Sequence, residues 1–225
     1  MRARTEAGRV RRALNLRPRV PGGVPMRRLD RWQAETMREE LADLYVESSL
    51  AAPGQGYRRR EDFLRRLAAD VRRPGFDMLI AQGGTLAGCV FGYPVGRDGS
   101  WWKGFVGALP KNLEQLTASG HVFAISEIMI HPHEREQGTG RRLQEALLAD
   151  QDASLGVTMV DAADAATCAV FLSWGWLEVG EARTPDAPGG SRVLVRQLGE
   201  RTAENPDGLT HDARTQPPEG SAEPL

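Results

Sequence analysis

The segment that most constrains the fold of this 225-residue chain lies beyond its middle, where an apolar run ends at a proline and a glycine-containing loop follows. The run from His121 to Ile130 is strongly apolar and predicts a buried strand. After Pro132, the loop Arg135-Glu136-Gln137-Gly138-Thr139-Gly140 leads into an amphipathic stretch, 140–152, that predicts a helix. A strand, a tight loop and a helix start in this order favour a loop that binds phosphate.

The physical reason lies in the backbone at the start of a helix. Its first N–H groups have no intrahelical acceptor, and the helix dipole adds positive potential there. Glycine at 138 and 140 leaves these N–H groups accessible to a phosphate, and Arg141 in the first turn suits a bound polyanion better than it suits the dipole. A P-loop is disfavoured because no Lys follows Gly140, and a dinucleotide-binding turn because position 143 is Leu. The alternative is an ordinary helix start.

The remaining pattern predicts an α/β protein. Helical periodicity covers about 31–49 and 60–71, with shorter helical stretches near 112–117 and 167–174. Further strands are predicted over 76–82, 85–95, 156–161, 177–183 and 192–198, the first two joined by a hairpin turn at Gly83-Gly84. This order implies a mixed sheet flanked by helices.

Composition divides the chain into three parts and excludes several functions. Residues 1–25 form a basic arm and 199–225 an acidic tail, both predicted to be disordered around a folded domain at 26–198, with Met26 as an alternative start. The net charge of −1 argues against a nucleic-acid partner. No apolar run approaches the ~18 residues of a membrane span, so we expect a cytoplasmic protein without a membrane partner. Cys89 and Cys168 lack metal-ligand spacing, so we expect free thiols and no metal site.

Two motifs resemble those of the GNAT (Gcn5-related N-acetyltransferase) superfamily. The first is Glu127-Ile128-Met129-Ile130-His131-Pro132 followed by Arg135-x-x-Gly138-x-Gly140. The second, Asp164-x-x-Thr167-x-x-x-Phe171-x-x-x-Gly175-Trp176, lies where the family commonly shows Asn-x-x-Ala-x-x-x-Tyr-x-x-x-Gly-Phe. The resemblance covers about 26–198, and the Gly-Trp pair is similar to actinobacterial members.

The resemblance implies a GNAT fold, with a mixed, mostly antiparallel sheet splayed between its two central strands. It also implies that acetyl-CoA binds in this splay, with the pyrophosphate at the glycine loop and the pantetheine along the backbone of the central strand. The cofactor-binding residues implied in this way are Ile128, Met129, Ile130, Arg135, Glu136, Gln137, Gly138, Thr139, Gly140, Arg141, Asp164, Thr167 and Phe171.

Acyl transfer requires that the amine lose a proton and that the leaving thiolate be stabilised. Glu127 is the candidate base, its alternative role being to orient the strand or a neighbouring Arg, and Ser126 is a weaker candidate. Phe171 occupies the position at which many GNAT enzymes carry a Tyr general acid, so that acid is missing. His131 and His133 are expected at the surface.

The sequence indicates the binding site of the acceptor amine less specifically than that of the cofactor. Candidate substrate-lining residues are Trp32, Tyr57, Trp101 and Trp102, with core packing as the alternative for the tryptophan pair. We expect a monomer or homodimer that transfers the acetyl group of acetyl-CoA to a small-molecule or peptide amine. The alternatives are a catalytically degenerate domain that senses acyl-CoA and a transferase for a longer acyl group.

Overall fold

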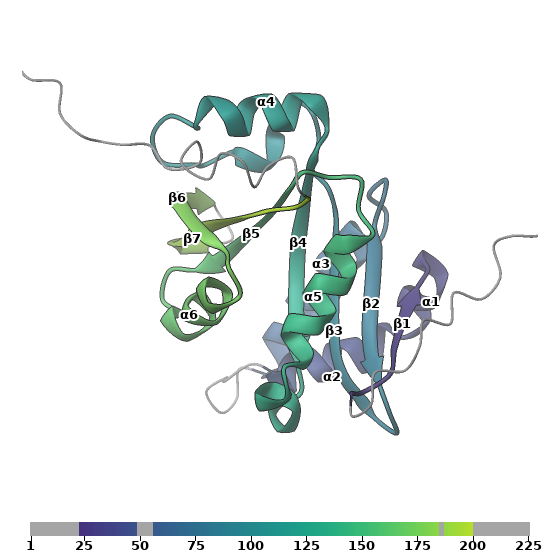
Figure 1. Ribbon diagram of the computed structural model, residues 1–225. Helices are drawn as coiled ribbons and strands as arrows, with labels where there is room; N and C mark the ends of the chain where they lie inside the picture. Colours follow the sequence, from purple (N-terminus) through teal and green to yellow (C-terminus); the bar gives the residue numbers. More distant parts are fainter. Residues whose placement is uncertain (1–22, 49–55, 185–186, 200–225) are drawn as a thin grey trace, which may run out of the picture.

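The computed structural model describes residues 23–48, 56–184 and 187–199, and they form a seven-stranded sheet flanked by helices (Figure 1). Its strand order is β1-β2-β3-β4-β5-β7-β6. The strands are β1 (Met26–Leu29), β2 (Asp77–Gln82), β3 (Leu86–Pro94), β4 (Val122–Ile130), β5 (Leu155–Asp161), β6 (Leu177–Thr184) and β7 (Ala187–Gln197). β4 and β5 pair in parallel and the other neighbouring strands antiparallel, which confirms the predicted mixed, mostly antiparallel sheet.

Helices cover both faces of the sheet. They are α1 (Arg31–Thr36), α2 (Arg38–Ser48), α3 (Gly56–Asp70), α4 (Lys111–Ser119), α5 (Thr139–Ala149) and α6 (Ala165–Ser173), with the 3₁₀ turns η1 (Ser100–Trp102) and η2 (Pro132–Gln137). α5 crosses one face over β2, β3 and β4, while α2 and α3 lie behind the sheet (Figure 1). Among the described helices, none is both long and apolar enough to cross a membrane.

Successive side chains of the inner strands point to opposite faces of the sheet, so each face has its own hydrophobic core. Leu79 of β2 packs with Leu143 and Leu147 of α5, whereas the adjacent Met78 and Ile80 pack on the α2 and α3 side. Each of these five side chains is at most 7% exposed. Because both faces are buried, β2 reads as a continuous apolar run instead of alternating apolar and polar residues.

The sheet opens between its two central strands. β4 and β5 pair only from Val122–Leu155 to Ala124–Val157, yet β4 continues to Ile130 and β5 to Asp161. Just beyond the last pair, the Thr158 hydroxyl donates to the Ile125 carbonyl at 3.1 Å. Past this bond the strands diverge, as Figure 1 shows, and the splay implied by the family resemblance is confirmed.

A β-bulge in β4 sits at the start of this splay. Phe91 of β3 lies opposite Glu127, and the next residue, Gly92, lies opposite Ile125, so Ser126 is the extra residue. Before the bulge the odd-numbered Ile125 packs under α5; after it the even-numbered Ile128 does so. The bulge therefore turns Glu127 to the face covered by α2 and α3.

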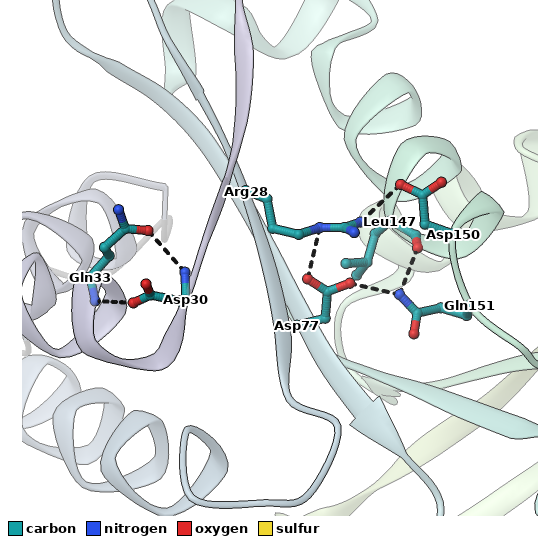
Figure 2. A network of polar contacts seen from close by, with 7 residues as sticks. All are labelled: Arg28, Asp30, Gln33, Asp77, Leu147, Asp150 and Gln151. Carbon is teal, nitrogen blue, oxygen red and sulfur yellow. Dashed lines mark hydrogen bonds and ion pairs between the residues drawn. The ribbon is translucent and has the colours of Figure 1, made fainter. Parts of the chain in front are cut away.

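A polar network fixes the far end of α5 to the sheet edge (Figure 2). Arg28 of β1 pairs with Asp77 of β2 at 3.0 Å and with Asp150, just after α5, at 3.1 Å. The Gln151 amide donates to Asp77 at 2.7 Å and to the Leu147 carbonyl at 3.0 Å. This clamp ties the C-terminal end of α5 to the edge of the sheet.

The N-terminal part departs from the sequence prediction. Met26–Leu29 is an edge strand, which the sequence pattern did not predict. The predicted helix 31–49 is two helices, because the chain turns at Met37 (φ −88°, ψ 7°). A capping box between Asp30 and Gln33 begins α1, with Gln33 N donating to the Asp30 carboxylate at 2.8 Å, and this box is also drawn in Figure 2.

Candidate active site

α5 begins directly after the loop that follows β4, as the sequence predicts. η2 carries the chain from β4 to Gly138, which has φ 70° and precedes α5 without a side-chain cap. The Arg142 N–H donates to the Gly138 carbonyl at 3.1 Å, which closes the first turn. The N–H groups that precede it lie in the turn where a helix has no acceptors of its own. An uncapped helix start of this kind attracts an anion.

The two glycines of the loop serve different purposes. Gly138 needs its positive φ, and a Cβ there would meet no atom within 4 Å, so the backbone stays open on that side. At Gly140 a Cβ would lie 2.9 Å from the Trp174 ring and 3.3 Å from Ile130. Gly140 therefore lets α5 pack closely on β4 and on Trp174, a packing role that the sequence did not reveal.

The polar residues of the loop have protein partners. Arg135 donates to the Ser48 carbonyl at the end of α2, and Arg141 pairs with Glu145 at 2.9 Å on the exposed side of α5. The Gln137 amide donates to the His133 carbonyl at 3.2 Å. Glu136 is exposed. These contacts hold the loop in place, and none of them caps the N-terminus of α5.

The edge of β4 that faces the splay presents the backbone of Ile128 and Ile130. His131 N–H donates to Ala87 O of β3 at 2.9 Å, so it points away from the splay. Backbone groups of successive strand residues point alternately to opposite sides. Those of Ile130 and Ile128 therefore point toward β5, which has already diverged, while the Met129 side chain is buried on the α2 side. An extended ligand could pair with this edge as an added strand.

α6 begins and ends with residues singled out from the sequence. The Asp164 carboxylate caps it, accepting from Thr167 N at 2.9 Å and Thr167 Oγ1 at 2.7 Å. Phe171 is 2% exposed, with ring centroids 5.4 Å from Trp174 and 5.3 Å from Trp176. Phe171 is thus part of the core behind the splay, in contact with the same Trp174 that covers Gly140.

Glu127 lies on the opposite face of the sheet, against α3. Its side chain is 23% exposed, and its carboxylate pairs with Arg66 at 3.2 Å. Burial raises the pKa of Glu127 to about 7; Arg66 pulls it down and the charge of Asp70 pushes it up. Glu127 is therefore both a partner of an Arg and a carboxylate able to exchange a proton near neutral pH.

Asp70 is a residue that the sequence analysis missed. It ends α3, is 7% exposed, and accepts from the Ser126 hydroxyl at 2.5 Å and from Arg73 at 3.1 Å. Arg73 also lies 4.3 Å above the Tyr93 ring. Burial and the charge of Asp70 raise the pKa of Tyr93. The available signal was spacing: Asp70 follows the buried Phe63 of α3 by two helical turns, a carboxylate on an apolar stripe.

The aromatic residues proposed to line the acceptor side are dispersed. Trp102 is buried and its indole donates to Thr117 at 2.9 Å, while Trp101 is half-buried and stacks edge-on against it at 4.7 Å. Trp32 is 76% exposed on α1, beside the sheet edge and away from the splay. The Tyr57 side chain lies outside the described residues. Trp101 thus remains the candidate from this set.

The described residues hold no group of three or more His, Cys, Asp or Glu side chains arranged to bind a metal ion. Cys89 and Cys168 are both free and buried.

Comparison with known proteins supports the fold alone. No protein-family model and no curated protein matches this chain. Aminoglycoside 6′-acetyltransferase type Ii is 12% identical with a TM-score of 0.55, over 78% of this chain and 99% of that one. PaiA N-acetyltransferase from Thermoplasma acidophilum, in complex with coenzyme A, is 12% identical with a TM-score of 0.52, over 77% and 98%.

A third similar structure, a protein from Desulfovibrio desulfuricans assigned to the GNAT family, is 12% identical with a TM-score of 0.53, over 78% of this chain and 99% of that one. The match spans nearly the whole length of each of these proteins. Together with the splayed sheet and the uncapped start of α5, it shows that this chain has the GNAT fold.

Proposed function

We propose that this chain is an N-acetyltransferase that transfers the acetyl group of acetyl-CoA directly to a small-molecule or peptide amine. The observation that carries the proposal is the open edge of β4 leading straight to the uncapped N-terminus of α5. One is an extended hydrogen-bonding edge and the other an anion site. Coenzyme A has both an extended amide-containing arm and a pyrophosphate, so this pair of features fits it.

The chain's own residues then divide the work of binding. The backbone N–H groups of Gln137, Gly138, Thr139, Gly140 and Arg141 would hold the pyrophosphate. The backbone of Ile128 and Ile130 would pair with the pantetheine arm. Asp164 and Thr167 lie at the start of α6, beside the carboxyl end of β5. Acetyl-CoA supplies the acyl group as a thioester, already activated toward an amine.

Glu127 is the proposed general base. A base works best when its pKa lies near the working pH, and the pKa of Glu127 is raised to about 7. Arg66 fixes the carboxylate in place at 3.2 Å. No proton donor stands at position 171, so the thiolate would leave unassisted from that side. A thiol pKa of about 8.5 makes this tolerable near neutral pH.

The proposal is tested by calorimetric titration with acetyl-CoA and with CoA, followed by thiol release over a panel of primary amines. We expect binding of both compounds at ~100 μM or below, within the usual range of substrate affinities. The variant Gly138→Ala places a methyl group on the open side of the loop and should weaken both affinities. Absence of binding by the wild-type chain at ~100 μM would overturn the proposal.

A second candidate is a catalytically degenerate domain that binds acyl-CoA as a sensor or regulator. Two observations favour it: Phe171 is buried between tryptophans without a hydroxyl, and Asp164 is engaged in capping α6. Binding of acetyl-CoA without thiol release from any amine would support this second function over the first.

A further inference from the structure

The proposed reaction uses one carboxylate, but the α3 side of the sheet holds two. Asp70 is 7% exposed, and its Oδ2 accepts from the Ser126 hydroxyl at 2.5 Å. The two residues are 56 positions apart in the chain, so the contact depends on the packing of α3 against β4. A charged group is costly to bury unless it is paired, and half of the pairing here comes from a hydroxyl on the central strand.

Ser126 stands where the sheet opens. It is the extra residue of the β4 bulge and lies two positions past Ala124, where the pairing with β5 ends. Ser126 is exposed although its partner is buried. Its single hydroxyl proton is donated to Asp70, and the Tyr93 side chain also forms a hydrogen bond with this hydroxyl, so its oxygen keeps one lone pair for a further donor.

An amine acceptor must lose two protons in this reaction. As an ammonium ion it loses one to become nucleophilic, and after its nitrogen has bonded to the acyl carbon it loses the second to become a neutral amide. Glu127 and Asp70 are two carboxylates at the same opening, each fixed by its own arginine, Arg66 at 3.2 Å and Arg73 at 3.1 Å.

We propose that Asp70 acts through Ser126: it orients the hydroxyl toward the acceptor amine, and the pair removes one of the amine's two protons. This inference rests on the proposed acetyltransferase function. The bond from nitrogen to the acyl carbon forms and the carbon–sulfur bond breaks, its electron pair leaving on sulfur. The amine proton passes to Ser126 Oγ as the hydroxyl proton passes to Asp70 Oδ2, which later releases it to water.

The charged and titratable groups around Asp70 agree with this role. Arg73 neutralises its other oxygen, and Arg66 and Glu127 lie farther along the same face. Burial raises the pKa of Tyr93 and of Cys89, and each shift is increased by a carboxylate nearby, Asp70 for Tyr93 and Glu127 for Cys89. Both groups therefore stay neutral near pH 7 and do not compete for the proton.

The test compares Ser126→Ala, Ser126→Thr and Asp70→Asn, with Asp77→Asn as the matched control. Asp77 is a part-buried carboxylate paired with Arg28, but it belongs to the clamp at the far end of α5. With the amine of the panel that reacts best, we expect kcat/KM to fall ~10²-fold in Ser126→Ala and Asp70→Asn. Ser126→Thr, which keeps a hydroxyl, and Asp77→Asn should stay within a few-fold of wild type. Affinity for acetyl-CoA should be unchanged in Ser126→Ala.

The pH profile separates this role from a structural one. Asp70 contributes to the raised pKa of Glu127, so Asp70→Asn should move the acidic limb of kcat/KM to lower pH. Ser126→Ala should lower the plateau without moving that limb. Should Asp70→Asn fail to fold, the exposed Ser126 still decides the question through its Ala and Thr variants.

The outcomes are distinguishable from those that test the function itself. If the wild-type chain is active and both Ser126→Ala and Asp70→Asn behave like Asp77→Asn, the relay is refuted. The proposed acetyltransferase function then still holds. Absence of acetyl-CoA binding, or of turnover with every amine, would remove the proposed function and the relay with it.

Discussion

Replacing Glu127 by Gln tests the proposed base most directly. The pKa of Glu127 is raised to about 7, because burial outweighs the attraction of Arg66. As a base it must be ionised to act, so activity should rise with pH through about 7 and level off above it. At pH 6 roughly one-tenth of the molecules carry the ionised form and at pH 8 roughly nine-tenths, so wild-type kcat/KM at pH 6 should be about a tenth of its plateau.

The glutamine side chain that replaces Glu127 has nearly the same size and shape, but it cannot accept a proton from the amine. We expect the plateau to drop ~10²-fold and the limb at about pH 7 to disappear. The assay is thiol release at saturating acetyl-CoA and limiting amine from pH 5.5 to 9. Because the amine titrates too, it is repeated with amines of different pKa: the limb that belongs to the amine moves, and that of Glu127 stays.

Glu39→Gln is the matched control, since Glu39 also pairs with an arginine, Arg60 at 2.8 Å, but on the exposed side of α2. Its profile should overlay that of wild type. A limb that persists at about pH 7 in Glu127→Gln, with an unchanged plateau, would show that Glu127 merely anchors Arg66 and would refute the assignment.

Three further predictions concern the loop, the clamp and the core. Gly138→Ala and Gly140→Ala should each destabilise the fold by about 1–3 kcal/mol in thermal unfolding, the first because of its positive φ and the second because the added methyl group overpacks the core. In calorimetry, Gly138→Ala should weaken CoA binding more than Gly140→Ala does. A double-mutant cycle on Arg28 and Asp77 should give a coupling below about 1 kcal/mol in urea unfolding, because the Arg28 side chain is 43% exposed; a larger value would show that the clamp acts as a buried unit. Phe171→Tyr should raise turnover or leave it unchanged, and a large loss in thiol release would show that position 171 serves packing alone and does not accept a hydroxyl.

The parts of the fold that the sequence predicts are those encoded locally. The apolar run of β4, the proline after it and the glycine loop lie within about twenty residues, and each has a physical meaning in isolation. Periodicity likewise predicts α3 and α5, because each has an apolar stripe that must be buried. The family resemblance then supplies the splay, which no local pattern encodes.

What the sequence does not predict depends on contacts between distant residues. The contact of Asp70 with Ser126 requires α3 to dock on β4, and the bulge that exposes Ser126 shows only in the register with β3. The strand Met26–Leu29 carries two arginines, a pattern typical of a protected edge that propensity alone does not distinguish from a loop. The packing of Trp174 on Gly140 is invisible for the same reason.

The bulge in β4 also determines which kinds of sequence change this strand can tolerate. Substitutions at Ser126 alter one hydroxyl and leave every neighbour in place. Deletion of that one residue would remove the bulge and restore strict alternation, with Glu127 still facing α3 and Ile128 still beneath α5. The strand can therefore lose this residue without exchanging its two faces, and what it loses is the hydroxyl that reaches Asp70 at the opening of the sheet.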